Sequence, residues 1–585
     1  MKKLPLFSLV LICAVFATAV SAQVSEQARN FQIDATHTGA TTSATLTPPL
    51  KQRWVVNFGQ PISYPLIADG RVYVTVKNAS VPGTTLFALN AANGATLWSS
   101  NLGGSFPWSG SCYENGRVFA LNASGLLRAF DGATGNVVWS ALLPNQFMFT
   151  SMPTVRDGVI YTGGAGSGGT VYAVNATNGA LLWTRSVANG DHSSPAVTND
   201  GVYVSYACPN VYKLDSVTGA VIWHFAPGCS GGGGKTPALY NDRLYVRDSA
   251  GTIHDSFTGA LIGNFVAKNT PVFSGSRGFF LEGPNFFGSF GTLRGRDVDT
   301  NAVLWSFAGD GSLQSAVLAV NDYVYVGSAS GKLYAVNAAT GQQVWVTQAG
   351  TSIPFVDEHN VSQPVTSFAS GEGLLVVPTS TTLVAYEGDI TPPVTQASLV
   401  GTSGTNGWFK SSVQVSLSAT DDFSGVANTF YSVDGGVTET YSGAFIVSAP
   451  GQHTVQFWSV DNAGNTEATQ MVEVKVDGVA PVVTAAANPS TAPKRPHSVT
   501  VTISGSATDA VSGISGASFN VIDEYGVTQP SGPVTVQANG SYSFSLVLPA
   551  TKHGSDKNGH LYTIVVTATD QAGNTASATT TLTIN

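Results

Sequence analysis

Charged residues are scarce in this sequence. Asp, Glu, Lys and Arg together make up 10 % of its 585 residues. Basic residues are the scarcer kind, with 26 Lys and Arg against 35 Asp and Glu, a net charge of −9. A protein that neutralises a nucleic-acid backbone needs clustered Lys and Arg side chains, and no such run occurs here. Nucleic acid is therefore excluded as a predicted partner.

Long hydrophobic runs are missing after the first 20 residues. Leu4–Val20 is apolar and follows two lysines, and Val20-Ser21-Ala22 places small residues where a signal peptidase cleaves. This pattern predicts a signal peptide over residues 1–22. The run is shorter than the roughly 20 residues that span a bilayer comfortably. We therefore expect an exported chain that lies in the periplasm, on the cell surface or outside the cell. It should have no transmembrane segment after cleavage.

Glycine, in contrast, is abundant at 64 residues, and it marks an internal repeat. Each copy has apolar residues, then Asn or Asp, a Gly four residues later, and Trp four residues after that. The Asn/Asp and Trp positions are Asn90 and Trp98, Asp131 and Trp139, Asn175 and Trp183, Asp215 and Trp223, Asn337 and Trp345. Two copies are degenerate: one has Gly263 in place of Trp, and the other has Asn301 in place of Gly.

The period of the repeat predicts an all-β fold. Successive Trp positions are 40 to 44 residues apart, the length of one four-stranded propeller blade. The Asn or Asp side chain bonds the turn backbone, and the Gly takes up positive φ. The apolar stretches on either side are then antiparallel strands, and the Trp is expected to cover the seam between neighbouring blades.

The two ends of the repeat region set the number of blades. Trp54 precedes the first full copy and has no hairpin partner, whereas residues 383–386 form a third strand with no Trp strand after it. The N-terminal strand can therefore serve as the missing Trp strand of the last blade, and residues 383–386 can serve as its missing hairpin partner. The sequence therefore predicts an eight-bladed β-propeller over residues 23–388, closed by the Trp54 strand so that no open edge remains.

These repeats resemble those of the pyrroloquinoline-quinone (PQQ) dehydrogenase-like propellers, over about residues 30–388. The same repeat occurs in the non-catalytic propeller subunit of the outer-membrane barrel assembly machinery. The resemblance implies a fold more strongly than a function, because the motif residues build blade packing. In the dehydrogenases, an adjacent Cys-Cys disulfide lies over a quinone that is held with Ca²⁺. This sequence has no adjacent cysteine pair, so we expect neither PQQ nor Ca²⁺ as a cofactor.

Cysteine is rare: three of the four remain after residue 22, so at least one thiol has no intrachain partner. Export makes a disulfide chemically possible. Cys208 and Cys229 follow predicted strands whose connections emerge on the same face of a blade, which predicts a disulfide between them. Two unpaired thiols are the alternative. Cys112 is expected to be a small core residue.

Aromatic and polar residues are expected at the mouth of the propeller channel, near the openings of the inner strands. They form a candidate ligand site, and they are Trp108, Phe149, His192, Lys235, Phe355 and His359. The alternative is that they only line and plug the channel. Asp357 and Glu358 precede His359, but adjacent residues on a strand point to opposite faces, so we predict no metal site.

After residue 388 the Trp motif stops and a second kind of repeat begins. Residues 389–477 and 478–585 share Asp421 with Asp509 and Asp461 with Asp570, each in a matching turn-like segment. Alternating Val, Thr and Ser predict two β-sandwiches. They resemble the bacterial Ig-like domains of secreted proteins. Such Asp residues could bind Ca²⁺ between modules, but a role in capping turns is favoured. Proline-containing junctions lead us to expect that the propeller and the sandwiches fold separately.

Taken together, these patterns favour an exported, non-catalytic binding or scaffold protein with no catalytic residues. Its propeller is expected to bind a protein or glycan of the cell envelope, with the Ig-like modules as spacers. Two alternatives remain open. One is a PQQ-dependent oxidoreductase, and the other is a polysaccharide-active enzyme of the cell envelope, for which no catalytic carboxylate pair can be identified.

Overall fold

The computed structural model describes residues 27–208, 210–228, 233–247, 251–283, 290–494 and 497–585. Its regular elements in these ranges are all β-strands. The described residues contain no helix long and apolar enough to cross a membrane. The chain divides into two compact units, and the boundary falls between Asp389 and Ile390.

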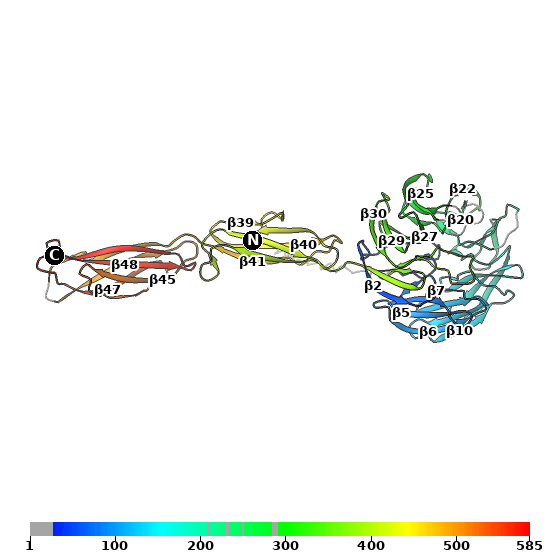
Figure 1. Cartoon of the computed structure of the whole chain (residues 1–585), viewed down its shortest axis with the longest axis horizontal. Helices are drawn as coiled ribbons and strands as arrows, with labels where there is room; N and C mark the ends of the chain where they lie inside the picture. The colour runs from blue at the N-terminus through cyan, green and yellow to red at the C-terminus, as the bar shows by residue number, and fades with distance from the viewer. Residues whose placement is uncertain (1–26, 209, 229–232, 248–250, 284–289, 495–496) are drawn as a thin grey trace, which may run out of the picture. The chain divides into compact units, whose positions relative to one another are not determined.

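The described residues of the first unit form eight sheets arranged as propeller blades (Figure 1), and their strands are antiparallel except for one short parallel pair in blade 7. Blades 1 to 4 consist of β3 (Leu66–Ala68), β4 (Arg71–Lys77), β5 (Thr84–Asn90) and β6 (Thr96–Gly103); β7 (Ser109–Glu114), β8 (Arg117–Asn122), β9 (Leu126–Asp131) and β10 (Val137–Leu142); β11 (Thr154–Arg156), β12 (Val159–Ala165), β13 (Gly169–Asn175) and β14 (Leu181–Val187); and β15 (Ala196–Thr198), β16 (Gly201–Tyr206), β17 (Asn210–Leu214) and β18 (Val221–Phe225).

Blades 5 to 8 follow the same plan, with two strands added from the N-terminal region. They consist of β19 (Ala238–Tyr240), β20 (Arg243–Val246), β21 (Gly251–Asp255) and β22 (Leu261–Phe265); β23 (Val272–Ser274), β24 (Arg277–Glu282), β25 (Thr292–Asp297) and β26 (Val303–Phe307); β27 (Leu313–Val320), β28 (Tyr323–Ser328), β29 (Lys332–Asn337) and β30 (Gln343–Gln348) with β1 (Ala40–Thr41); and β31 (Ala369–Gly371), β32 (Leu374–Pro378), β33 (Thr382–Gly388) and β2 (Leu50–Asn57).

Blade 8 closes the ring in the predicted way. Its outer strand β2 pairs antiparallel with β33, and Trp54 lies opposite Ala385. The first long strand of the chain therefore completes the last blade. The prediction of eight blades closed by the Trp54 strand is confirmed.

The repeated Trp and Gly residues form one contact between successive blades. Six of the Trp indole N–H groups donate to the carbonyl of the residue after Asn or Asp in the next blade. The pairs are Trp54 with Ala91, Trp98 with Gly132, Trp139 with Ala176, Trp183 with Ser216, Trp223 with Ser256, and Trp305 with Ala338. The Gly of that next copy lies under the indole ring. At Gly219, for example, a Cβ atom would lie 2.6 Å from the Trp183 ring.

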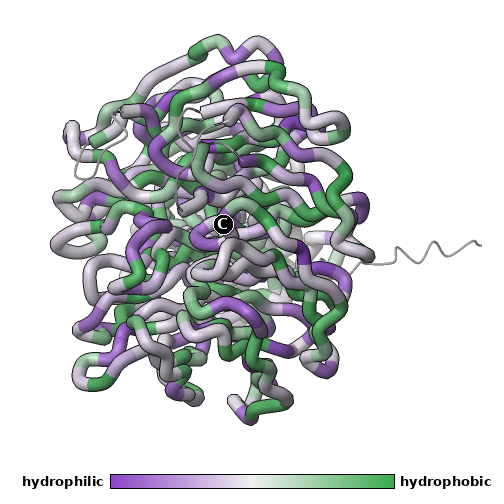
Figure 2. The backbone as a smooth tube through the Cα atoms, turned by 90° about the vertical axis from the view of Figure 1, so that its right-hand side faces the viewer, coloured by the Kyte–Doolittle hydropathy of each residue, from purple (hydrophilic) through white to green (hydrophobic). Residues whose placement is uncertain are grey.

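The two degenerate copies follow the same rule. Gly263 stands where blade 5 should provide Trp, and the blade after it has Asn301 where the other copies have Gly. With no indole ring above it, position 301 has room for a side chain, and Asn301 keeps a positive φ of 58°. Its amide Nδ2 donates to the Asn264 carbonyl at 3.2 Å, which provides a different blade-to-blade hydrogen bond. Figure 2 shows how short hydrophobic stretches alternate with hydrophilic ones along the backbone.

Residues 28–41, which we call the inner segment, contact the inner strands of blades 1 to 7 in chain order. Inner-strand N–H groups donate to this segment at 2.7–3.0 Å, in the pairs Ile67 to Ala28, Tyr113 to Arg29, Val155 to the Asn30 side chain, Val197 to Ala35, Leu239 to Thr36, Phe273 to Thr38, and Ala319 to Gly39. Buried N–H groups at a free strand edge need acceptors, and the inner segment provides them. It therefore lines the channel and ties the blades together.

The second unit contains two β-sandwiches of identical strand order. The first pairs a sheet of β34 (Val394–Val400), β36 (Val413–Thr420) and β39 (Phe445–Val447) with one of β35 (Trp408–Phe409), β41 (Gln470–Val476), β40 (Gly451–Asp461), β37 (Val426–Val433) and β38 (Glu439–Thr440). The second pairs β42 (Val482–Asn488), β44 (Ser498–Thr508) and β47 (Ser541–Pro549) with β43 (Thr491–Ala492), β49 (Thr575–Ile584), β48 (His560–Asp570), β45 (Ile514–Asp523) and β46 (Ser531–Val534). The two modules are thus structural repeats of each other, each with its own apolar core.

Candidate binding site at the channel mouth

Residues 351–368, which we call the axial segment, connect β30 to β31 without strand structure. The carbonyl of Ile353 accepts a hydrogen bond of 2.8 Å from the Gln314 side chain of blade 7. The carbonyl of Val365 accepts one of 2.8 Å from the backbone of Tyr64, which leads into blade 1. His359 Nε2 lies 2.9 Å from the carbonyl of Gly234, which leads into blade 5. Because these contacts reach opposite sides of the ring, the axial segment crosses the channel.

A buried ion pair anchors the axial segment. Arg247 directly follows β20, and its Nη2 lies 2.6 Å from Glu358 Oε2, with side chains 3 % and 6 % exposed. Glu358 Oε1 also accepts the backbone N–H of Thr236 at 2.9 Å. Burial opposes ionisation of Glu358, but the Arg247 charge and the hydrogen bonds from Thr236 and Arg247 outweigh it and lower its pKa. The pair fills the channel entrance with the chain's own charges.

This arrangement corrects one sequence interpretation. We expected Asp357, Glu358 and His359 to lie on a strand, but they lie in a non-strand turn. The alternation of faces along a strand therefore does not apply. Instead the turn buries Glu358 while His359 reaches the Gly234 backbone. Arg247 and Glu358 were not singled out from the sequence, because an Arg and a Glu 111 residues apart carry no local signal.

Two of the predicted site residues, His192 and His359, meet at the channel mouth. Their ring centroids are 4.9 Å apart. His192 Nδ1 lies 3.5 Å from Asp191 Oδ2, a distance too long for a good hydrogen bond. Burial lowers the pKa of His192. In the described part of the chain, these two rings belong to no group of three potential metal ligands. The pair offers polar ring nitrogens at the mouth but does not by itself make a metal site.

The other four predicted residues have different environments. Trp108 and Phe149 are completely buried in the apolar cores of the propeller. Lys235 is half-buried beside the histidine pair, where its carbonyl accepts the Ser193 hydroxyl at 3.3 Å. Phe355 lies on the axial segment and lines a pocket.

The pocket beside the axial segment, which we call the mouth pocket, has a volume of about 480 Å³. Blades 6, 7, 8 and 1 and the axial segment all contribute to its walls. Its lining includes Pro61, Ile62, Phe290, Gln314, Phe355 and Thr366. Apolar walls with a few amide and hydroxyl groups are typical of ligand sites.

Cys112 and Cys208 are not among the residues that line this pocket. Cys208 is disulfide-bonded. Its predicted partner, Cys229, lies outside the described residues. Cys112 is a free thiol in the core, and burial raises its pKa well above the ordinary value.

Comparison with known proteins relates the repeats to one family. A family model described as outer membrane protein assembly factor BamB matches residues 82–168, 167–259 and 254–414, together more than half of the chain. The chain is 25 % identical over 244 residues to the outer membrane protein assembly factor BamB of Moranella endobia, which covers 37 % of this chain and 59 % of that protein.

Two further curated relatives are enzymes. The chain is 26 % identical over 183 residues to a tetrathionate hydrolase of Acidithiobacillus ferrooxidans, covering 27 % of this chain and 37 % of the enzyme. It is 30 % identical over 198 residues to the dehydrogenase subunit of the quinone alcohol dehydrogenase of Gluconacetobacter polyoxogenes, covering 29 % of this chain and 26 % of the subunit. The chain thus spans less than two thirds of the length of each of these three relatives.

Solved structures with a similar fold include BamB from Moraxella catarrhalis. It is 17 % identical with a TM-score of 0.45, and the match covers 58 % of this chain and 99 % of that one. Another is the quinohemoprotein alcohol dehydrogenase from Comamonas testosteroni. It is 14 % identical with a TM-score of 0.49, and the match covers 65 % of this chain and 83 % of that one.

Proposed function

Because this chain belongs to the repeat family described as outer membrane protein assembly factor BamB, we propose that it is an exported, non-catalytic binding or scaffold protein. Its propeller binds a protein or glycan of the cell envelope, and the two sandwiches, predicted to be Ig-like, act as spacers. One observation carries the proposal. The chain's own side chains fill the channel entrance, while a pocket of about 480 Å³ remains beside them.

The residues at the channel do not fit a quinone cofactor. A quinone in the axis would have to displace the axial segment, which is held by the buried Arg247–Glu358 pair. Breaking such a pair leaves an uncompensated buried charge and costs about 3–5 kcal/mol. Within residues 27–388, the described side chains form no group of three potential metal ligands that could hold a Ca²⁺ ion beside it. The sequence also has no adjacent cysteine pair.

The chemistry of the mouth pocket suggests what it binds. Ile62, Phe290 and Phe355 offer apolar surface, and Gln314 and Thr366 offer hydrogen-bonding groups. An aromatic or aliphatic side chain of a peptide, or the apolar face of a sugar ring, matches this combination. The histidine pair at the same mouth adds polar ring nitrogens that can contact the rest of a larger partner.

A Phe355→Ala substitution tests the proposal. Purified wild-type protein and the variant are immobilised and exposed to solubilised cell-envelope extract. One portion of the extract is first digested with protease and another is oxidised with periodate to destroy glycans. We expect Phe355→Ala to retain about tenfold less of one component, equivalent to about 1.4 kcal/mol. Loss of that component after one pretreatment identifies it as protein or glycan.

Phe257→Ala is the matched control, because Phe257 is an exposed phenylalanine on the turn between β21 and β22 of blade 5. It should retain the wild-type amount. Equal retention by all three proteins would refute binding at the mouth pocket. A second measurement separates the enzymatic alternative: stoichiometric binding of PQQ in the presence of Ca²⁺, measured by calorimetry, would refute the non-catalytic assignment.

A further inference from the structure

Three aspartates converge in the second sandwich. Asp477 follows β41 and precedes β42, Asp509 lies in the turn after β44, and Asp570 ends β48. One oxygen from each carboxylate lies within 4.8 Å of an oxygen from both others. Asp477 and Asp570 are fully buried, and Asp509 is half-buried. Three turns far apart in the sequence thus place negative charges in one small volume.

Each of these carboxylates uses one oxygen to hold its own loop. Asp509 Oδ1 accepts three successive backbone N–H groups, from residues 511 to 513, at 2.8–3.0 Å. Asp477 Oδ1 accepts the N–H of Val479 at 3.0 Å, and Asp570 Oδ1 accepts that of Asn574 at 2.8 Å. The turn-capping role favoured from the sequence is therefore present. It occupies Oδ1 in each case. Asp570 Oδ2 also accepts the Asn574 side-chain amide at 2.9 Å, whereas Asp477 Oδ2 is buried without a partner.

The second oxygen of Asp477 points to a missing ligand. Asp477 is 0 % exposed, and its Oδ2 atom has no hydrogen-bond partner. The three ion pairs in the described part of this unit all use other carboxylates. A buried carboxylate oxygen beside two like charges, with neither a donor nor a counter-charge, is strongly disfavoured unless a cation binds there.

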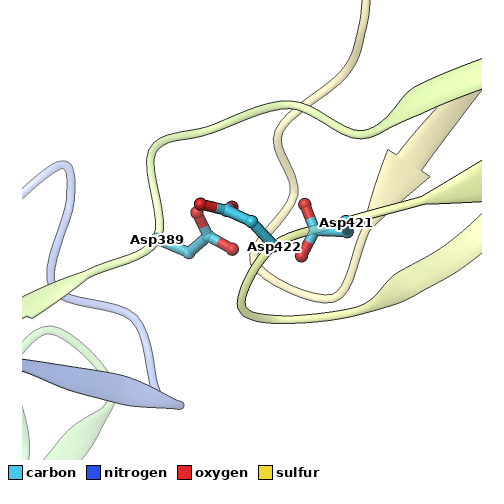
Figure 3. Close-up of side chains that lie close together, drawn as sticks. All are labelled: Asp389, Asp421 and Asp422. Carbon is cyan, nitrogen blue, oxygen red and sulfur yellow. The ribbon is translucent and has the colours of Figure 1, made fainter.

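The first sandwich repeats the pattern. Asp421 follows β36 as Asp509 follows β44, and its Oδ2 atom is likewise buried without a partner. Asp461 ends β40 as Asp570 ends β48, and it accepts the corresponding Asn465 N–H at 2.8 Å. Figure 3 shows Asp421 with its neighbour Asp422 on the turn after β36. Each sandwich thus has one buried carboxylate oxygen without a partner beside these turns, Asp421 Oδ2 in the first and Asp477 Oδ2 in the second, although the two aspartates are not at equivalent positions.

We propose that Asp477, Asp509 and Asp570 bind a calcium ion at the start of the second sandwich. A hard cation with oxygen ligands suits an all-carboxylate set, and Ca²⁺–O bonds of about 2.4 Å bring two ligand oxygens to at most about 4.8 Å from each other. Ca²⁺ tolerates irregular coordination completed by water, whereas Mg²⁺ requires near-ideal octahedral geometry at shorter distances. Imidazole and thiolate ligands, which favour transition metals, are not part of this group.

The ion would join the linker between the sandwiches to two turns of the second one. The turn between β48 and β49 also receives hydrogen bonds from the first sandwich. Lys410 Nζ donates to the Gly573 carbonyl at 2.6 Å, and the Thr405 N–H donates to the Ala572 carbonyl at 3.0 Å. Calcium binding therefore holds the linker residue Asp477 against the turn that already contacts the neighbouring module.

Isothermal titration of the full chain with CaCl₂ tests the site. Asp477→Asn and Asp509→Asn each keep the Oδ1 acceptor that holds the turn but remove the negative charge. We expect each variant to bind one Ca²⁺ fewer per chain than the wild type. The matched control is Glu524→Gln, an exposed residue of the same sandwich whose Oε1 accepts the Leu561 N–H and can do so as an amide. It should bind as many ions as the wild type.

Differential scanning calorimetry in Ca²⁺ and in EGTA keeps the test valid if a variant folds poorly. Ca²⁺ should raise the melting temperature of the wild-type transition that contains residues 390–585, and the rise should be smaller in Asp477→Asn. No Ca²⁺ binding by the wild type, or the same number of ions bound by wild type and both aspartate variants, would overturn the proposal. Displacement of Ca²⁺ by an equal concentration of Mg²⁺ would overturn the choice of metal.

Discussion

The contact between Trp and Gly in successive blades can be tested by introducing, at another pair of blades, the Gly and Asn combination found at Gly263 and Asn301. Trp183 is 9 % exposed and covers Gly219, where a Cβ atom would lie 2.6 Å from the indole ring. Gly219→Asn introduces that atom without a large backbone penalty, because Asn tolerates the positive φ of 69° found there. Overpacking of this kind costs about 1–3 kcal/mol.

Removing the ring should remove the cost. In a Trp183→Gly background, the Gly219→Asn change reproduces the natural combination of Gly263 and Asn301, and its cost should fall to a few tenths of a kcal/mol. The coupling energy between the two substitutions is then about 1–3 kcal/mol. An unfolding entropy of about 2.1 cal/mol/K per residue gives roughly 0.8 kcal/mol per degree for the propeller, so the coupling corresponds to roughly 1–4 °C.

Calorimetry of the propeller transition in the four proteins of this cycle measures the coupling directly. Gly116→Asn is the matched control, because Gly116 has a φ of 78° and nothing within 4 Å of its Cβ position. It should lower the melting temperature by less than Gly219→Asn does. The reasoning fails if Gly219→Asn costs the same with and without the Trp183 ring, or no more than Gly116→Asn.

Three further predictions concern the propeller. Glu358→Gln leaves the Arg247 charge buried without a counter-charge, so it should lower the free energy of unfolding by about 3–5 kcal/mol. In calorimetry at pH 7 this corresponds to a melting temperature lower by roughly 4–6 °C, and an unchanged melting temperature would contradict the ion-pair assignment. Since the folded-state pKa of Glu358 is lowered, its contribution to the free energy of unfolding is fully present above the unfolded pKa of about 4.3 and is lost as the pH falls through the lower folded pKa. Calorimetry between pH 3 and 7 should therefore show a smaller fall of the melting temperature with acid in Glu358→Gln than in the wild type. Parallel curves of melting temperature against pH would refute this. Deletion of residues 23–60 removes β1, β2 and the inner segment, so no cooperatively melting propeller should remain, and a soluble deletion product with a sharp transition would disprove the closure.

The sequence was sufficient for the blade number and for the closure of the ring, because both depend on local chemistry at a fixed period. An Asn or Asp that bonds a turn, a Gly with positive φ and a Trp four residues later recur in five complete copies, and two degenerate copies keep the same spacing. The unpaired Trp54 strand then leaves only one way to avoid an open edge. The same kind of periodic signal exposed the paired Asp landmarks of the two sandwiches.

Contacts between residues far apart in the chain were decided only by the tertiary structure. The inner segment has no hydrophobic period, because its backbone carbonyls make the contacts to six of the seven blades and a carbonyl carries no residue signal. The axial segment buries Glu358 against Arg247, and it does so because its turn is not a strand, which the local pattern could not reveal. Asp477, Asp509 and Asp570 each look like an ordinary turn cap in sequence. Their convergence, and the unsatisfied Asp477 oxygen between them, exist only after the sandwich has brought three distant turns together.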